Sequence, residues 1–127
     1  MKLAIIGSRT FNNFPGALEA FNRHFPNGRI SEIVSGGANG ADAIGKAIAG
    51  HLRLKYTEFK PDWQTFGRGA GFKRNIQIID YCDEVLAFWD NSSRGTAHSI
   101  ELARTQGKKV TIIPFQASQG WTDFGLD

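Results

Sequence analysis

Ser35-Gly36-Gly37-Ala38-Asn39-Gly40-Ala41-Asp42 is the stretch that decides the fold. It follows a short apolar run, residues 32–34, and leads into a segment with helical spacing that extends to about Leu52. Glycine can adopt positive φ and has no Cβ, so the backbone can turn sharply here and lie against a ligand. The first N–H groups of a helix lack intrahelical partners and lie at its positive end, which favours a phosphate or carboxylate. The stretch therefore predicts an anion site, and a tight turn without a ligand is the alternative.

The amino-acid composition and the net charge limit the classes of protein to which this chain can belong. The 127 residues include 41% hydrophobic and 21% charged residues, which is typical of one globular domain, here residues 1–127. The net charge of +3 suits an anionic ligand, but no block of Lys and Arg forms a nucleic-acid arm. No apolar run reaches the length of a membrane span, so we expect no membrane partner. The single cysteine, Cys82, and three scattered histidines predict neither a disulfide nor a metal site, and we expect a cytoplasmic protein without a cofactor.

Apolar periodicity predicts alternating strands and helices. The expected strands are residues 2–6, 32–34, 54–59, 84–89 and 109–114, and the expected helices are residues 14–25, 41–52, the later part of 69–82, and 96–106. Residues 60–75 form the longest irregular loop in this assignment, and residues 115–127 have no clear assignment. Such alternation predicts an α/β fold, a Rossmann-like three-layer sandwich whose parallel sheet has about five strands in the order 3-2-1-4-5.

In such sheets, ligands bind beyond the carboxyl ends of the strands, near the switch in strand order. Four loops should meet there: residues 7–11, 35–42, 60–75 and 90–96. The predicted ligand-binding residues are Gly7, Ser8, Arg9, Ser35, Gly36, Gly37, Asn39, Gly40, Asp42, Trp63, Arg74, Asn75, Gly95 and Thr96.

Residue chemistry suggests a role for several of these side chains. Arg9 can bind a phosphate with a bidentate fork, or it can be solvated while Ser8 or Thr10 caps a helix. Of the basic residues Arg68, Lys73 and Arg74, which cannot all point at one site, Arg74 is the preferred anion ligand. Trp63 could stack on a base or ribose, or could anchor its loop. Asp42 and Glu101 are the candidate catalytic carboxylates, with capping or solvation as the alternative role for each. His98, which lies in an expected helix, is a further candidate for acid–base chemistry, although a lone histidine in a helix usually has no such role.

The motifs Gly7-Ser8-Arg9-Thr10-Phe11, Ser35 to Asp42, Asp62-Trp63, Gly69-Ala70-Gly71, Arg74-Asn75 and Gly95-Thr96 occur together and in order. Over residues 1–114 the chain resembles the YspA-like branch of the SLOG superfamily. The resemblance implies a Rossmann-like fold that senses or processes nucleotides and nucleotide-derived ligands. Its relatives include the LOG phosphoribohydrolases and DNA-processing protein A. It also implies a homo-oligomer, because family relatives assemble through their helices.

One motif departs from the LOG enzymes, which carry Pro-Gly-Gly-x-Gly-Thr-x-x-Glu. Here Ser99 stands three residues after Thr96, and Glu101 comes two positions later. The departure argues against LOG-type hydrolysis of an N-glycosidic bond and leaves the binding loop intact.

Three hypotheses follow. In the first, the chain is a domain that binds a nucleotide or nucleotide-derived small ligand, with phosphates on the helix starts at residues 36–40 and 95–96. In the second, it is a nucleotide hydrolase, such as a nucleoside-monophosphate phosphoribohydrolase, that uses Asp42 or Glu101 beside the ribose. In the third, it binds single-stranded nucleic acid, for which the sequence offers only Trp63 and the basic residues within 68–74.

Overall fold

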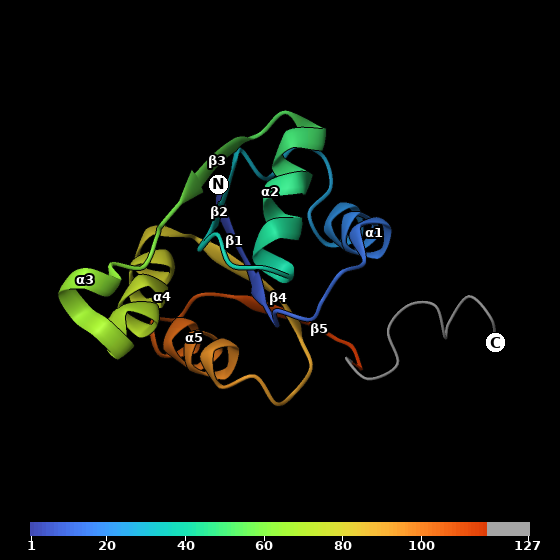
Figure 1. Cartoon of the computed structure of the whole chain (residues 1–127). Coiled ribbons are helices and arrows are strands. Elements are labelled where there is room, and N and C mark those ends of the chain that lie inside the picture. Colours follow the sequence, from blue (N-terminus) through green and yellow to red (C-terminus); the bar gives the residue numbers. More distant parts are fainter. Residues whose placement is uncertain (117–127) are drawn as a thin grey trace.

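The computed structural model describes residues 1–116 (Figure 1). Its elements are β1 (Lys2–Gly7), α1 (Phe14–His24), β2 (Glu32–Ser35), α2 (Ala41–Leu52), β3 (Lys55–Glu58), α3 (Trp63–Phe66), η1 (Gly67–Gly69), α4 (Ala70–Tyr81), β4 (Glu84–Trp89), α5 (Arg94–Thr105) and β5 (Val110–Pro114). The five strands pair in parallel in the order β3-β2-β1-β4-β5. The predicted α/β Rossmann-like fold and its strand order are confirmed.

Alternation along the central strand divides the core into two layers. Successive side chains of a strand point to opposite faces of the sheet. Leu3 and Ile5 are buried with residues of α1 and α2, whereas Ala4 and Ile6 are buried with residues of α4 and α5. Helices therefore cover both faces of the sheet (Figure 1), which explains why the central strands β1 and β4 are largely continuous apolar runs.

The structure corrects the assignment of residues 60–75 as an irregular loop. This segment contains α3, the single 3₁₀ turn η1 and the first turns of α4. The Asp62 side chain caps α3 by accepting a hydrogen bond from the Thr65 N–H at 3.2 Å. In addition, α5 begins at Arg94, two residues before the predicted start. Residues 117–127, which include Trp121 and Phe124, lie outside the described part of the chain.

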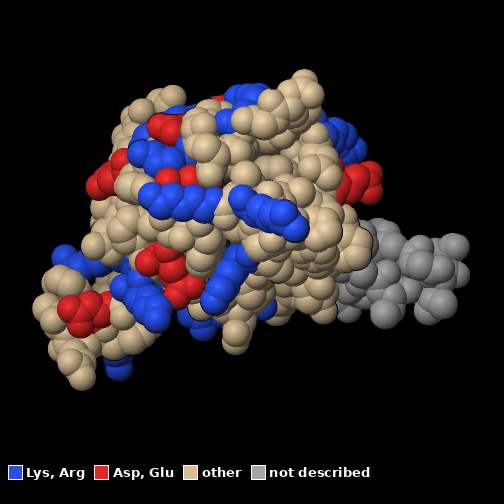
Figure 2. Space-filling model, turned by 90° about the horizontal axis from the view of Figure 1, so that it is seen from above, with Lys and Arg blue, Asp and Glu red and all other residues tan. Residues whose placement is uncertain are grey.

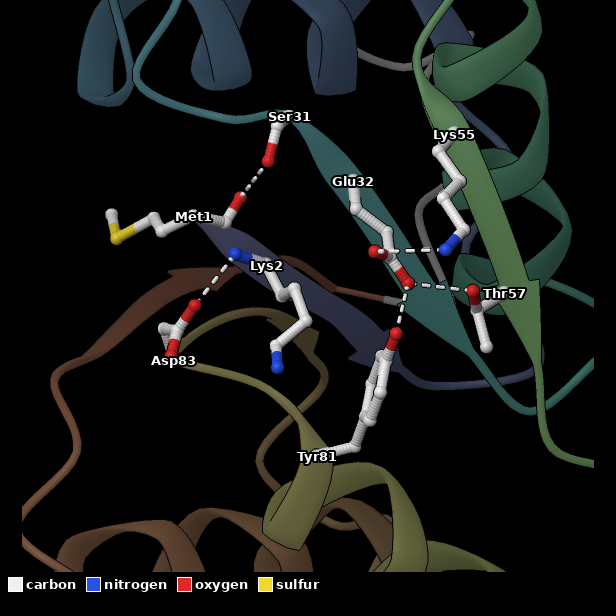
Figure 3. A network of polar contacts seen from close by, with 8 residues as sticks. All are labelled: Met1, Lys2, Ser31, Glu32, Lys55, Thr57, Tyr81 and Asp83. Carbon is white, nitrogen blue, oxygen red and sulfur yellow. Dashed lines mark hydrogen bonds and ion pairs between the residues drawn. The ribbon is translucent and has the colours of Figure 1, made fainter.

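A network of polar contacts joins residues at the amino end of the sheet (Figure 3). The buried Glu32 carboxylate accepts hydrogen bonds from the hydroxyls of Thr57 at 2.6 Å and Tyr81 at 2.7 Å, and it pairs with Lys55 at 3.7 Å. Nearby, the Lys2 N–H donates to the Asp83 carboxylate at 2.8 Å. On the face shown in Figure 2, Lys and Arg side chains lie among Asp and Glu side chains. The candidate ligand site lies at the carboxyl ends of the strands, at the other end of the sheet from the Glu32 network.

Candidate ligand-binding site

Two neighbouring pockets lie beyond the carboxyl ends of β1, β2 and β4. Pocket A has a volume of about 270 Å³ and is lined by Ile6, Gly7, Arg9, Ala38, Asp42, Arg74, Asn75, Ile78, Ser93, Gly95, Thr96 and Ser99. Pocket B has a volume of about 290 Å³ and is lined by Arg9, Gly36, Gly37, Ala38, Asn39, Pro61, Trp63 and Arg74. Arg9, Ala38 and Arg74 line both pockets, so one elongated ligand could occupy them together. This is the switch point of the sheet, where the chain crosses from β3 to β4.

Arg74 is the central cation of the two pockets. Its side chain extends from α4 and is 9% exposed. Nη1 donates to the Gly36 carbonyl at 2.7 Å, and Nε donates to the Asn75 side-chain oxygen at 2.8 Å. Three of the five guanidinium N–H groups have no acceptor among residues 1–116 and remain available to a ligand. Burial lowers the pKa of Arg74, Asp42 opposes that shift, and Arg9 adds to it.

Gly36 is required for this arrangement. A Cβ at this position would lie 2.5 Å from Nη1 of Arg74 and 2.7 Å from its Cδ. The guanidinium therefore packs directly on the bare backbone of the glycine loop. A side chain at position 36 would push the cation away from both pockets.

Asp42 is the carboxylate of pocket A. It lies in the first turn of α2, is 7% exposed, and accepts a hydrogen bond from the Ala38 N–H on Oδ2 at 3.2 Å. Burial raises the pKa of Asp42 to about 6, because the charged form loses water, although backbone N–H groups and Arg74 oppose the shift. Glu58, on β3, adds a smaller upward effect on this pKa. Pocket A therefore combines a buried carboxyl group with a buried guanidinium cation.

The first turns of α2 and α5 both lie at the site, but they differ in whether their N–H groups are free to bind an anion. At α2, the first N–H, from Ala41, already donates to the Ser8 carbonyl at 3.2 Å, and Asp42 supplies a negative charge to the same turn. At α5, no side chain caps the first turn, and the N–H groups of Gly95 and Thr96 have no acceptor among the described residues. The structure thus favours the start of α5, rather than the start of α2, as the one open to an anion.

The loop before α5 is fixed by Asp90. Its carboxylate accepts from the N–H groups of Ser92 and Ser93 at 2.9 and 2.8 Å, and its own N–H donates to the Ser8 hydroxyl at 3.1 Å. Ser8 therefore joins the loop after β1 to the loop after β4. The Ser93 and Thr96 hydroxyls lie 3.2 Å apart at the wall of pocket A. These contacts hold the start of α5 in place beside Arg74.

Pocket B is bounded by an aromatic side chain. Trp63, the first residue of α3, is 55% exposed and faces the glycine loop across the pocket. Gly37 adopts a positive φ of 72°, and a Cβ there would lie 2.6 Å from the Glu58 carboxyl carbon. The loop can therefore keep this close contact with β3 only as glycine. A planar group could lie between Trp63 and this loop.

Most predicted site residues line a pocket, and a few support it instead. The lining residues are Gly7, Arg9, Gly36, Gly37, Asn39, Asp42, Trp63, Arg74, Asn75, Gly95 and Thr96. Three others are supports that line neither pocket. Ser8 carries the two contacts described above, the buried Ser35 hydroxyl lies 2.6 Å from the Tyr56 hydroxyl, and Gly40 packs on the carbonyls of Ser8 and Arg9.

The structure does not bring Glu101 to the site. Glu101 is exposed and lines neither pocket, although Ser99, two residues before it, does. Two positions along a helix rotate a side chain by about 200° around the axis. His98 is also exposed, and its ring contacts Phe72 edge to face. Asp42 is therefore the one candidate catalytic carboxylate that reaches pocket A.

Sequence reasoning missed several lining residues. Ser93 and Ser99 add hydroxyls to pocket A, Pro61 contributes to pocket B, and Ala38 lines both. Ser99 occupies the motif position that holds Glu in the LOG enzymes, which was the available signal. The others carry no distinctive chemistry and are recognised only once the chain is folded.

A third depression, pocket C, borders the site along α3 and α4. Its volume is about 360 Å³, and it is lined by Lys60, Asp62, Phe66, Ala70, Lys73, Arg74, Ile76 and Gln77. Phe66 and Phe72 are 45% and 49% exposed, and the Lys73 ammonium lies 4.7 Å from the centre of the Phe66 ring. Exposed aromatic and basic side chains therefore continue outward from Trp63.

Two other kinds of site find no support in the described part of the chain. No helix within residues 1–116 is long and apolar enough to cross a membrane. Across the same residues, no three His, Cys, Asp or Glu side chains are grouped to hold a metal ion.

Comparison with known proteins finds a similar phage protein by sequence and a similar fold among solved structures. No protein-family model matches the chain. The chain is 35% identical over 89 residues to the Gene 61 protein of Mycobacterium phage D29, and the alignment covers 65% of this chain and 70% of that protein. Among solved structures it matches DNA processing protein A from Helicobacter pylori, described for its single-stranded DNA binding mode, with a TM-score of 0.70. That match shares 22% identity and covers 98% of this chain and 73% of the other, so it shows a common Rossmann-like fold.

Proposed function

The chain belongs to the family of the Gene 61 protein of Mycobacterium phage D29, and from that starting point we propose that it binds a nucleotide or nucleotide-derived small ligand, as a sensor or ligand-processing domain. The ligand lies across pockets A and B, with a phosphate on Arg74, Arg9 and the start of α5, and a base beside Trp63. We also propose that the chain is a cytoplasmic homo-oligomer of the YspA-like branch of the SLOG superfamily.

The observation that carries this proposal is the position of Arg74. A guanidinium that is 9% exposed, fixed by two hydrogen bonds and directed at two joined pockets is costly to bury without an anionic partner. No ion pair with Arg74 is found within residues 1–116, since the pairs there join Arg29 to Glu84, Lys55 to Glu32 and Lys60 to Glu58. A phosphate supplied by a ligand would complete the bidentate geometry that arginine favours.

The test is a thermal-shift screen of the purified protein followed by calorimetry. The panel contains nucleoside monophosphates, ADP-ribose, cyclic dinucleotides and a short single-stranded oligonucleotide. A ligand that binds only the folded state raises Tm, and the rise grows with its concentration relative to Kd. We expect Arg74→Ala to abolish the shift, and Arg68→Ala to retain it, because Arg68 is exposed on η1 and lines none of the three pockets.

Arg74→Lys separates folding from binding. It keeps a positive charge beside Gly36 but loses the planar fork, so it should fold with a Tm close to that of the wild type and still bind at least tenfold more weakly. Equal affinity of the wild type and both Arg74 variants would contradict the proposed site. Chromatography of the ligand after incubation distinguishes a binder from a hydrolase.

A second function, binding of single-stranded nucleic acid, is favoured by one specific observation. Exposed Trp63, Phe66 and Phe72 lie with Lys60 and Lys73 along α3 and α4, and exposed rings among cations suit stacked bases and phosphates. Fluorescence anisotropy with an oligothymidylate tests it. Affinity that falls steeply with salt, and falls again in Phe66→Ala and Phe72→Ala, supports this function. Loss of binding in the Arg74 variant alone assigns the oligonucleotide to pockets A and B.

A further inference from the structure

We propose that Asp42 makes pocket A selective for ligands whose sugar carries free hydroxyl groups, so that the site takes ribonucleotides or related ribose phosphates in preference to deoxy analogues. This inference rests on the proposed function and adds the substrate class. It concerns the side of the pocket opposite the phosphate.

The first argument is the unused hydrogen-bonding capacity of the carboxylate. An ionised carboxylate is an acceptor with about four lone-pair sites and donates nothing. Among the described residues, Asp42 accepts a hydrogen bond from the Ala38 N–H on Oδ2, and the Gly36 N–H is directed at the same carboxylate, which leaves about two of its acceptor sites free. No oxygen of Asp42 is both sealed from solvent and unpartnered, so its free acceptor sites open into pocket A. A ligand group that satisfies them must be a donor, and a sugar hydroxyl is such a group.

The second argument is the separation of charge around the pocket. Asp42 forms no ion pair within residues 1–116, so its carboxylate lies more than 4.0 Å from the Arg74 nitrogens, and both side chains line the same cavity. Glu58 adds negative charge on the Asp42 side, whereas Arg9 and the open start of α5 add positive character on the other side. A phosphate is therefore repelled from one side and attracted to the other. A sugar phosphate that spans the two sides places its phosphate at Arg74 and its hydroxyls at Asp42.

The alternative is that Asp42 only caps the glycine loop. Asparagine at position 42 would serve that purpose equally well, because its side-chain oxygen also accepts from the Ala38 N–H. One substitution at position 42 therefore distinguishes the structural role from the ligand role. Asp42→Asn keeps the shape and the loop contact and removes the charge, and with it the strong acceptor.

The experiment is calorimetry with AMP, 2′-deoxy-AMP and 2′,3′-dideoxy-AMP on the full chain. The three probes carry the same base and the same phosphate, so differences in Kd report the hydroxyls. In the wild type we expect AMP to bind at least tenfold more tightly than the dideoxy analogue, with 2′-deoxy-AMP between them. In Asp42→Asn the ratio should fall to about one to threefold, because AMP weakens while the dideoxy analogue binds as before or more tightly.

Two controls isolate the carboxylate. Glu19→Gln removes the same charge from an exposed position on α1 and should keep the wild-type ratio. Lowering the pH from 7.5 to 5 should reduce the wild-type ratio toward that of the variant, since Asp42, which has Arg74, Glu58 and Tyr56 as its charged and titratable neighbours, then carries a proton. The phosphate protonates equally in all three probes and cancels from the ratio.

The outcomes separate this inference from the proposed function. Equal binding of AMP and dideoxy-AMP by the wild type, or an unchanged ratio in Asp42→Asn, overturns the inference while the site itself stands. Absence of binding by all three probes at millimolar concentration overturns the proposed function for monophosphates and this inference with it.

Discussion

Gly40 and Gly28 both adopt positive φ, at 77° and 71°, but their surroundings differ. A Cβ on Gly40 would lie 2.4 Å from the carbonyl oxygens of Ser8 and Arg9, whereas a Cβ on Gly28 would meet nothing within 4 Å. Gly28→Ala should cost about 1 to 2 kcal/mol of unfolding free energy from backbone strain alone. Gly40→Ala should cost at least about 2 kcal/mol more, because the backbone must also shift. Urea denaturation of both variants measures the difference, and equal losses would show that the loop adjusts without strain.

Asp42 should make the stability of the unliganded protein depend on pH. Its folded pKa is raised from 3.8 to about 6, so the folded state binds the proton more tightly than the unfolded state. The contribution to stability is fully present below about pH 4 and is lost as the pH rises through 6, up to about 3 kcal/mol. Asp42→Asn should therefore raise Tm at pH 7.5, with the difference shrinking toward pH 4. A variant less stable than the wild type at pH 7.5 would contradict this account.

At the scale of single residues, local chemistry identified some side chains of the site and missed others. Arg74 stood out because a cation among glycines suits an anion, and Asp42 stood out because a carboxylate at the start of a helix in the glycine loop could act beside a ribose. Glu101 was placed among the candidates because sequence distance does not reveal on which side of α5 a residue lies. Ser99 was missed as a lining residue for the same reason. Rotation about a helix axis depends on packing against the sheet, which the sequence specifies only through the whole core.

At the scale of elements, the sequence predicted every strand and the four long helices, because each carries its own apolar periodicity. It missed α3, which has four residues and no buried side chain. So short a helix has no periodicity to detect, and Gly67 and Gly69 beside it indicated an irregular loop. The cap from Asp62 to Thr65 was the available signal, and it is a weak one without tertiary contacts.

The loop before α5 allows a prediction with a matched pair of variants. Asp90→Ala removes the acceptor for the N–H groups of Ser92 and Ser93 and should cost about 1 to 2 kcal/mol of stability. It should also weaken nucleotide binding about tenfold, because the start of α5 is no longer held beside Arg74. Asp90→Asn keeps an acceptor oxygen and should retain most of both properties. If the alanine variant keeps the wild-type Kd, the loop is not needed to position α5.

At the scale of the molecule, polar contacts at the amino end of the sheet stabilise the fold, and the carboxyl end holds the candidate ligand site. Glu32 joins the amino end of β2 to Lys55 and Thr57 of β3 and to Tyr81 at the end of α4 (Figure 3), whereas the pockets lie at the carboxyl ends of the strands. Glu32→Ala should cost about 3 kcal/mol, because it leaves the Thr57 and Tyr81 hydroxyls without their shared acceptor. The Kd for a bound nucleotide should stay within about twofold of the wild-type value.

Paired measurements of unfolding and of nucleotide affinity check this separation. Glu19→Ala, which removes an equal charge from an exposed position, should change neither quantity. A Kd that rises tenfold in Glu32→Ala would mean that the two ends of the sheet are coupled.

The central position of β1 has a consequence for the order in which the protein assembles during synthesis. β1 is synthesised before both of its partners, and one of them, β4, pairs with it at residues 81 positions later, as Leu3 with Glu84. Closing so long a loop is slow, so the edge of β1 that pairs with β4 stays unpaired after β1 and β2 have been synthesised. Pocket A has walls from both partners of this late pairing, since Gly7 is the last residue of β1 and Gly95 follows β4. A ligand can therefore find a complete pocket A only after β4 and the first turns of α5 have joined β1, and copies that end before Ser99 lack part of its wall.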